Sequence, residues 1–252
     1  MGEGSALQEN KRKIETTSFS LHVMAMLFML CDHLWATVVP GNDWMNCVGR
    51  LAFPIYAFLI VEGYFHTKNL KKYVGRLLLA AVLSEIPFNL MVGGSVFFPM
   101  YQNVLWTFLL AIGLIHWNES VKGKALPVRL LVGAAVVGAA YIGGTLTFAD
   151  YQSGGVLTVL VFYVFRGTSW GRRLGQLLCL GYINFELLGG LTYTISVFGQ
   201  TLFVARQGFA VLALIPIWLY RGKQGLRGKA LQYTYYAFYP VHLLVLGLLR
   251  VL

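Results

Sequence analysis

The feature that most constrains this chain is a series of apolar runs, each about as long as a bilayer is thick. A helix needs about 20 residues to cross about 30 Å of hydrocarbon. Only 12% of the residues are charged, whereas a soluble domain needs roughly a quarter. We therefore predict an all-α, polytopic integral membrane bundle of about nine (roughly 8 to 10) transmembrane helices. The apolar segments are 19–39, 49–66, 73–92, 101–118, 125–143, 150–166, 174–190, 200–220 and 231–250.

The first apolar run follows a basic cluster, Lys11, Arg12 and Lys13, as in a signal peptide. It is about as long as a membrane span and has no small-x-small cleavage site. We expect it to remain as an anchor, with residues 1–18 as a cytoplasmic N-terminal segment.

Basic residues fall on alternate loops between these segments, and only Arg50, Arg206 and Arg250 lie elsewhere. The positive-inside rule then places the N-terminus in the cytoplasm and the C-terminus outside. The net charge of +10 is therefore mainly a signal of topology, and we expect no nucleic-acid partner. The loop residues are Lys11, Arg12, Lys13; Lys68, Lys71, Lys72, Arg76; Lys122, Lys124, Arg129; Arg166, Arg172, Arg173; and Arg221, Lys223, Arg227, Lys229.

Several polar side chains recur at one level, in the outer half of the predicted bundle. An unpaired charge at that depth costs several kcal/mol, so such groups pair with one another or line a hydrated cavity. Individually they are consistent with structural ion pairs; together they favour one polar chamber. The residues are Asp32, His33, Arg50, Glu85, Asn103, Asp150, Glu186 and Arg206.

Asp32 and His33 are neighbours in the chain, so on a helix they point about 100° apart. Asp32 is therefore a poor orienter for His33, and we expect the two side chains to meet different partners. A single helical histidine is often a hydrogen-bonded core residue, but the surrounding carboxylates and arginines favour a catalytic role for His33.

Prolines lie beside these polar groups. Pro87 follows Glu85, Pro54 follows Arg50, and Pro240 precedes His242. Each proline removes a helical hydrogen bond, so the three predict a shaped pocket.

On the cytoplasmic side, Glu62 and His66 are four residues apart and can pair on one helical face. His66, Thr67 and Lys68 either meet an anionic donor or form an interfacial cap for that helix.

Motifs of soluble enzymes, including a P-loop and a His-Glu-x-x-His zinc motif, do not occur in the sequence. The three cysteines, Cys31, Cys47 and Cys179, are too scattered for a metal motif or a disulfide framework. Asp32, His33 and Glu85 have no metal-ligand spacing, so we expect no metal.

Five stretches of the sequence closely resemble the TraX family of bacterial membrane proteins, which is linked to N-terminal acetylation of conjugative F-pilin. That family is similar in turn to the wider group of transmembrane acyltransferases, which includes the lysosomal heparan-glucosaminide acetyltransferase type. The match follows chain order from the first predicted helix to the last. The stretches are MLCDH (29–33), RLAFPIYAFLIVEGYFHTKN (50–69), RLLLAAVLSEIPFN (76–89), NVLWTF (103–108) and YPVHLLVL (239–246).

The resemblance implies a single transmembrane acyltransferase-like domain over 19–252 in the bacterial inner membrane. Its reaction would move an acyl group, most simply acetyl, from cytoplasmic acetyl-CoA to an amine or hydroxyl at the outer face. The acceptor would be a pilin peptide, a glycan or a small amine.

The resemblance also suggests roles for the polar residues. His33 would be the base or would itself carry the acyl group, with Glu85 or Asp150 orienting it. Arg50 or Asn103 would stabilise the oxyanion, and Asp32 would complete the catalytic group. The residues expected to contact the substrates are Glu62, His66, Lys68, Asn103, Asp150, Arg206 and His242.

Two other functions stay open from the residues. The first is a proton-coupled transporter with Asp32, His33 and Glu85 as a relay, against which the lack of an internal repeat counts. The second is a non-catalytic membrane subunit, which leaves the interior charges poorly explained.

Overall fold

Helices make up most of the chain that the computed structural model describes, residues 15–251. The prediction for Lys11, Arg12 and Lys13 falls outside those residues. The α-helices are α1 (Ser18–Thr37), α2 (Asp43–Gly49), α3 (Ala52–His66), α4 (Leu70–Gly93), α5 (Val104–Ser120), α6 (Leu126–Leu146), α7 (Gln152–Val164), α8 (Trp170–Tyr182), α9 (Leu214–Trp218) and α10 (Lys229–Val251). A π-helix, η1 (Ile183–Leu187), continues α8, and a 3₁₀ helix, η2 (Arg206–Ala213), precedes α9.

Five helical segments within residues 15–251 are long and apolar enough to cross a membrane. Four of them are the single helices α1, α4, α6 and α10. The fifth is the segment Asp43–His66, which includes both α2 and α3. Large apolar side chains on α4, including Leu79, Val82, Leu83 and Ile86, are exposed, as expected for a surface that faces lipid. The larger count of about nine spans stays a prediction.

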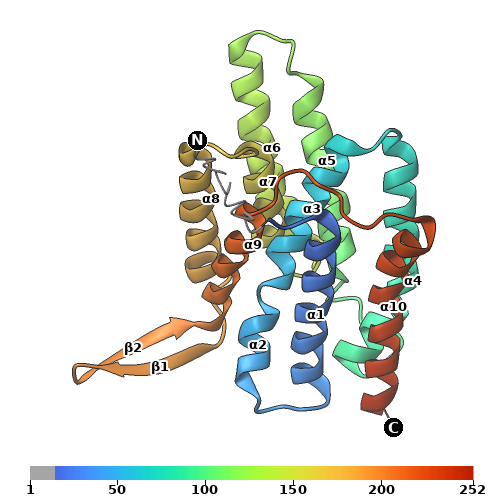
Figure 1. The fold of residues 1–252 in the computed structure, drawn as a ribbon, viewed down its shortest axis with the longest axis vertical. Coiled ribbons are helices and arrows are strands. Elements are labelled where there is room, and N and C mark those ends of the chain that lie inside the picture. The colour runs from blue at the N-terminus through green and yellow to red at the C-terminus, as the bar shows by residue number, and fades with distance from the viewer. Residues whose placement is uncertain (1–14, 252) are drawn as a thin grey trace, which may run out of the picture.

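The prediction of an all-α chain is wrong between η1 and η2. Strands β1 (Thr192–Val197) and β2 (Gln200–Ala205) form an antiparallel hairpin, although an apolar helix was expected from residue 200. The stretch TYTISV is rich in Thr, Tyr, Ile and Val, which favour strands. Phe198 and Gly199 both have positive φ, which is the backbone that a tight two-residue hairpin turn needs. The hairpin projects from the bundle beyond α2 (Figure 1).

The helical hydrogen bond that Pro54 is predicted to remove lies at the junction of α2 and α3. Arg50 and Leu51 form the turn between α2 and α3. Pro54 lies four residues after Arg50 and has no N–H, so the Arg50 carbonyl loses its usual helical donor. Pro87 and Pro240, by contrast, lie inside α4 and α10 without ending them.

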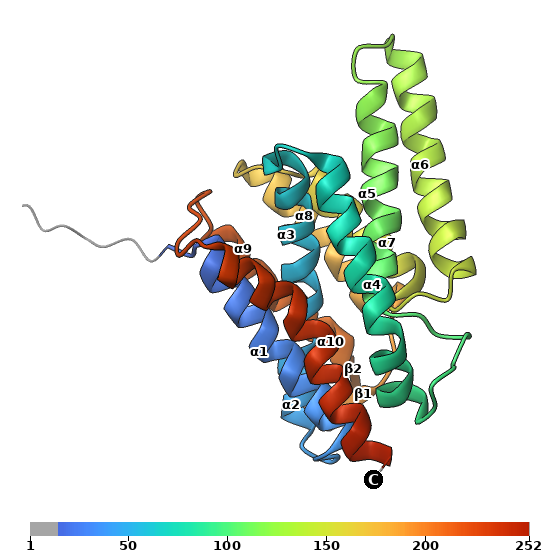
Figure 2. The ribbon, with the colours of Figure 1, turned by 90° about the vertical axis from the view of Figure 1, so that its right-hand side faces the viewer.

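Helix α10 packs along α4 and also contacts α1, as both views show (Figures 1 and 2). Gly247 allows this close approach, because a Cβ atom there would lie 2.8 Å from Leu90 Cβ on α4. Gly49 does the same for α2, since its Cβ atom would lie 2.4 Å from Asp32 Cβ on α1. Gly247 thus allows α10 to lie close to α4, and Gly49 allows α2 to lie close to α1.

Two of the connections lie at opposite ends of the molecule (Figure 1). The loop between α1 and α2 is at the same end as the C-terminus, whereas the loop between α5 and α6, with Lys122 and Lys124, is at the other end (Figure 1). Helix α1 therefore runs from the end near α9 toward the end that bears the hairpin.

Candidate functional site

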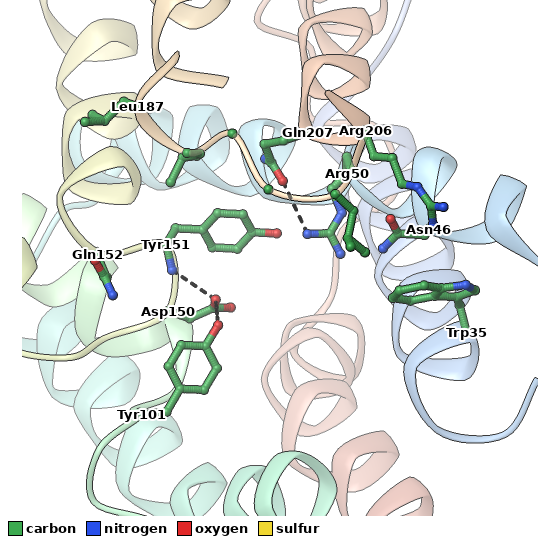
Figure 3. Close-up of a pocket in the computed structure, with 14 residues that line it drawn as sticks. Trp35, Asn46, Arg50, Tyr101, Asp150, Tyr151, Gln152, Leu187, Arg206 and Gln207 are labelled. Atoms are coloured by element: carbon green, nitrogen blue, oxygen red, sulfur yellow. Dashed lines mark hydrogen bonds between the residues drawn. The ribbon is translucent and has the colours of Figure 1, made fainter. Parts of the chain in front are cut away.

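A cavity of about 410 Å³ opens between α1, α2, the start of α7 and the segments that flank the hairpin. We call it the Arg50 cavity. Figure 3 shows Arg50 and Tyr151 pointing toward one another across it. Its lining consists of Trp35, Asn46, Arg50, Tyr101, Asp150, Tyr151, Gln152, Leu187, Leu188, Gly189, Gly190, Leu191, Arg206 and Gln207. Arg50, Asp150 and Arg206, which are far apart in the sequence, therefore share one cavity.

Arg50 is held by a short network. Its Nη2 atom forms an ion pair with Asp32 Oδ2 on α1, and its Nη1 donates to Gln207 Oε1 at 3.3 Å. Asn46 Nδ2 donates to the other Asp32 oxygen at 2.8 Å. The Arg50 Nε atom is buried without a hydrogen-bond partner among the described residues. The guanidinium is therefore fixed by Asp32 and Gln207, while its buried Nε–H has no partner among the described residues.

Arg206 closes the hairpin side of the Arg50 cavity. Both of its Nη atoms donate to the carboxylate of Asp43 on α2, each at 2.7 Å. Its guanidinium also lies over the Tyr193 ring, 4.4 Å from the centroid. Because Arg206 directly follows β2 and Tyr193 lies in β1, this contact fixes the base of the hairpin against the cavity.

Asp150 lies in the loop before α7. The Tyr101 hydroxyl and the Tyr151 backbone N–H both donate to its Oδ1. Burial raises the pKa of the Asp150 carboxyl to about 6, although the hydrogen bond from Tyr101 and the charge of Arg50 oppose that rise. Asp150 therefore changes charge near neutral pH, which is unusual for an aspartate.

His33 pairs with His242 rather than with a carboxylate. His33 Nδ1 lies 2.7 Å from His242 Nε2, and the planes of the two rings differ by only 7°. The expectation that Asp32 and His33 meet different partners is confirmed. The idea that Glu85 or Asp150 orients His33 is wrong, because both carboxylates bond elsewhere.

Glu85 accepts hydrogen bonds from Asn103 Nδ2 and Trp106 Nε1 at the start of α5. Asn103 Nδ2 also donates to the Ala81 carbonyl, and its Oδ1 caps Leu105 N–H. Both Asn103 donors are thus in use, which favours Arg50 over Asn103 for stabilising an oxyanion; the role of Asn103 stays a prediction. These contacts join α4 to α5.

A second cavity, of about 470 Å³, begins near the start of α1 and the loop before α10. We call it the tyrosine cavity, because Tyr56, Tyr73, Tyr220, Tyr235, Tyr236 and Tyr239 line it. Glu62, His66, Arg76 and Arg227 also line it. The predicted pair is confirmed, with His66 Nδ1 3.7 Å from Glu62 Oε2, while Arg166 Nε donates to the other Glu62 oxygen at 2.7 Å. Lys68 is exposed and is not part of this lining.

The two cavities approach each other around His33. On α1, Met29 lines the tyrosine cavity and Trp35 lines the Arg50 cavity. These positions are about 9 Å apart along a helix, and His33 lies between them. Before α5, Tyr101 lines one cavity and Val104 lines the other. Along the chain, His33 and Asn103 therefore lie between residues that line the two cavities.

Sequence reasoning placed some of these residues correctly and missed others. It grouped Arg50, Asp150 and Arg206, but Glu186 is exposed on η1 and lies outside the cavity. It also expected Asp32, His33 and Glu85 to share one chamber, whereas they bond to separate partners. The missed residues are Asn46, Tyr101, Tyr151 and Gln207. Asn46 lies four residues before Arg50, and Gln207 directly follows Arg206. For these two residues, closeness in sequence to a predicted site residue was a signal that could have identified them.

Comparison with known proteins gives a consistent result. The model of the TraX protein family matches residues 19–250. "Probable fimbrial assembly protein FimC, serogroup H1" of Dichelobacter nodosus is 27% identical, over 93% of this chain and 96% of that protein. "Protein TraX" of Escherichia coli is 25% identical, over 91% of this chain and 85% of that protein. No solved structure matches significantly. The chain is a membrane protein and belongs to the TraX family.

Proposed function

We propose that this protein is a membrane-embedded acyltransferase that uses acetyl-CoA from the cytoplasm and acylates an amine or hydroxyl at the outer face of the bacterial inner membrane. One observation carries the proposal. On α1, the residues that line the two cavities, Met29 and Trp35, are less than two helical turns apart, and His33 lies between these positions.

The tyrosine cavity is the donor site in this proposal. It lies among the ends of α1, α3 and α10 that the basic loops mark as cytoplasmic. Arg76 and Arg227 line it and would bind the phosphates of CoA, with His66 and Glu62 near the entrance. Its deeper part, at Met29, Val104 and Tyr239, would receive the thioester.

The Arg50 cavity is the acceptor site. The neutral His33 imidazole takes a proton from the acceptor, and the acceptor's nitrogen or oxygen attacks the thioester carbonyl. The carbonyl oxygen gains negative charge, which Arg50 stabilises. When the C–S bond breaks, the CoA thiolate leaves and takes up the proton that His33 holds, so the reaction yields an acylated acceptor and free CoA. In the alternative route, His33 itself carries the acyl group.

The charges of the Arg50 cavity favour an amine. Arg50 and Arg206 are already paired with Asp32 and Asp43, whereas no basic side chain forms an ion pair with Asp150 among the described residues. Asp150 would therefore hold a cationic acceptor. The name of the Dichelobacter nodosus relative, a probable fimbrial assembly protein, supports a pilin peptide as that acceptor, ahead of a glycan or a small amine.

A proton-coupled transporter is the alternative, because cavities at opposite ends of a bundle also suit alternating access. The decisive experiment incubates purified protein with labelled acetyl-CoA and an amine acceptor. We expect CoA release together with labelled acceptor, and loss of both in His33→Ala. Undiminished turnover in His33→Ala would reject the role of His33, and solute transport without acyl transfer would favour the transporter.

A further inference from the structure

The hydrogen bonds of His242 determine which nitrogen of His33 is free to act as a base. His242 lies on α10, buried against Phe238 and Tyr239. Its Nδ1 atom lies 2.6 Å from the Phe238 carbonyl oxygen, one turn earlier in the same helix. A carbonyl oxygen can only accept a hydrogen bond, so His242 Nδ1 must carry the hydrogen.

The position of the hydrogen on His242 determines the position of the hydrogen on His33. A neutral imidazole has one N–H, so the Nε2 atom of His242 is a bare acceptor. It lies 2.7 Å from His33 Nδ1, and that contact is a hydrogen bond only if His33 Nδ1 donates. The hydrogen of neutral His33 is therefore on Nδ1, and its Nε2 atom carries the free lone pair.

We propose that His242 is a positioning residue that fixes His33 in the Nδ1–H tautomer and so presents His33 Nε2 as the proton acceptor. This inference rests on the proposed acyl transfer. It replaces the expectation that His242 contacts substrate, since both ring nitrogens of His242 already form hydrogen bonds, one with His33 and one with the Phe238 carbonyl. The role is the one that a carboxylate plays for the histidine in other hydrolytic and acyl-transfer sites, performed here by a second imidazole anchored to its own helix.

An uncharged hydrogen-bond partner for His33 suits the interior of a membrane protein. A carboxylate would bring another charge beside Asp32 and Arg50, which already neutralise each other, and uncompensated charge is costly inside a membrane. The neutral His242 imidazole instead offers its Nε2 atom as an uncharged acceptor for the hydrogen on His33 Nδ1. Its own orientation is set by the Phe238 carbonyl and by stacking on the Phe238 ring, 4.6 Å between centroids.

Two variants separate positioning from packing. His242→Gln retains an oxygen acceptor close to the position of Nε2, whereas His242→Leu fills similar space without an acceptor. We expect His242→Leu to lower kcat by about 10- to 100-fold with KM for acetyl-CoA within about twofold, and His242→Gln to recover most of that loss. Equal losses in both variants, or a His242→Leu enzyme within about twofold of wild type, would overturn the proposal. His116→Gln is the matched control, because His116 is exposed and, within the described part of the chain, hydrogen-bonds only to Tyr64.

A spectroscopic test does not depend on turnover. In protein labelled with ¹⁵N-histidine, the His33 signals, identified by their loss in His33→Gln, should show a protonated Nδ1 and an unprotonated Nε2 at slightly alkaline pH. In His242→Leu, the hydrogen should move largely to Nε2, the form that free histidine prefers. An Nε2–H tautomer of His33 in the wild-type protein would refute the proposal. If the tautomer is found but acetyl-CoA is not consumed, the proposed function fails and the positioning stands.

Discussion

At the scale of single residues, Asp32 and His33 illustrate what a sequence can and cannot predict. Helical geometry separated them correctly, because adjacent side chains diverge by about 100°. Their partners, Arg50 and His242, lie on other helices. Spacing along one chain does not determine which distant side chain completes a hydrogen bond, so Glu85 and Asp150 were equally reasonable partners for His33 before the fold was known.

Breaking the Asp32–Arg50 pair should be costly. Asp32→Asn leaves the Arg50 charge without its counter-ion in a mostly buried place, where the side chains of Arg50 and Asp32 are 20% and 15% exposed. We expect the free energy of unfolding to fall by about 3 kcal/mol, measured by denaturant titration in detergent. In the double variant Asp32→Asn with Arg50→Gln, part of the loss should return. A strictly additive double variant would contradict a direct pairing.

Asp150 should give acceptor binding a dependence on pH. Burial raises the pKa of this carboxyl to about 6, so the carboxylate predominates above that pH and the neutral acid below it. KM for an amine acceptor should therefore increase as the pH falls from about 7 to 5. In Asp150→Asn, KM should be high and independent of pH over that range. A wild-type KM that does not change across pH 6 would exclude Asp150 from binding the amine.

At the scale of elements, periodicity located the long helices well but not the irregular segments between them. The break at Arg50 was visible in advance because Pro54 removes a hydrogen bond. The hairpin was not predicted, since an uncharged stretch such as TYTISVFGQTLFVA has the composition of both a membrane helix and a pair of strands. Apart from the hairpin, the predicted segments that are not long enough to span a membrane are shorter helices, such as α5 and α7, among residues 15–251.

The contact of α2 with α1 depends on Gly49. A methyl group there would lie 2.7 Å from Asp32 Oδ1, so Gly49→Ala must push the helices apart or displace the ion pair. We expect a loss of about 1–3 kcal/mol in unfolding free energy, together with reduced acyl transfer. Gly138→Ala is the control. Gly138 is exposed in α6 with no atom within 4 Å of the added Cβ, so this change should be neutral or slightly stabilising. Equal effects of the two substitutions would contradict a specific contact at Gly49.

At the scale of the whole molecule, the basic loops predict that the N-terminus is cytoplasmic and the C-terminus is outside. The structure has the C-terminus and the α5–α6 loop at opposite ends (Figure 1). A reporter enzyme that is active only outside the cytoplasm should be active when it is fused after Leu252. A reporter enzyme that is active only in the cytoplasm should be active when it is fused in the loop after Ser120, where Lys122 and Lys124 lie. The reverse pattern would exchange the proposed donor and acceptor sides.

The central claim is that an acyl group crosses the layer between the two cavities. Protein of uniform orientation in proteoliposomes tests it most directly, with labelled acetyl-CoA on the cytoplasmic side and an impermeant amine acceptor on the other. We predict labelled acceptor only when donor and acceptor are on opposite sides, and none with His33→Ala. Transfer only when both substrates share one side, or passage of a solute with no acylation, would contradict the account.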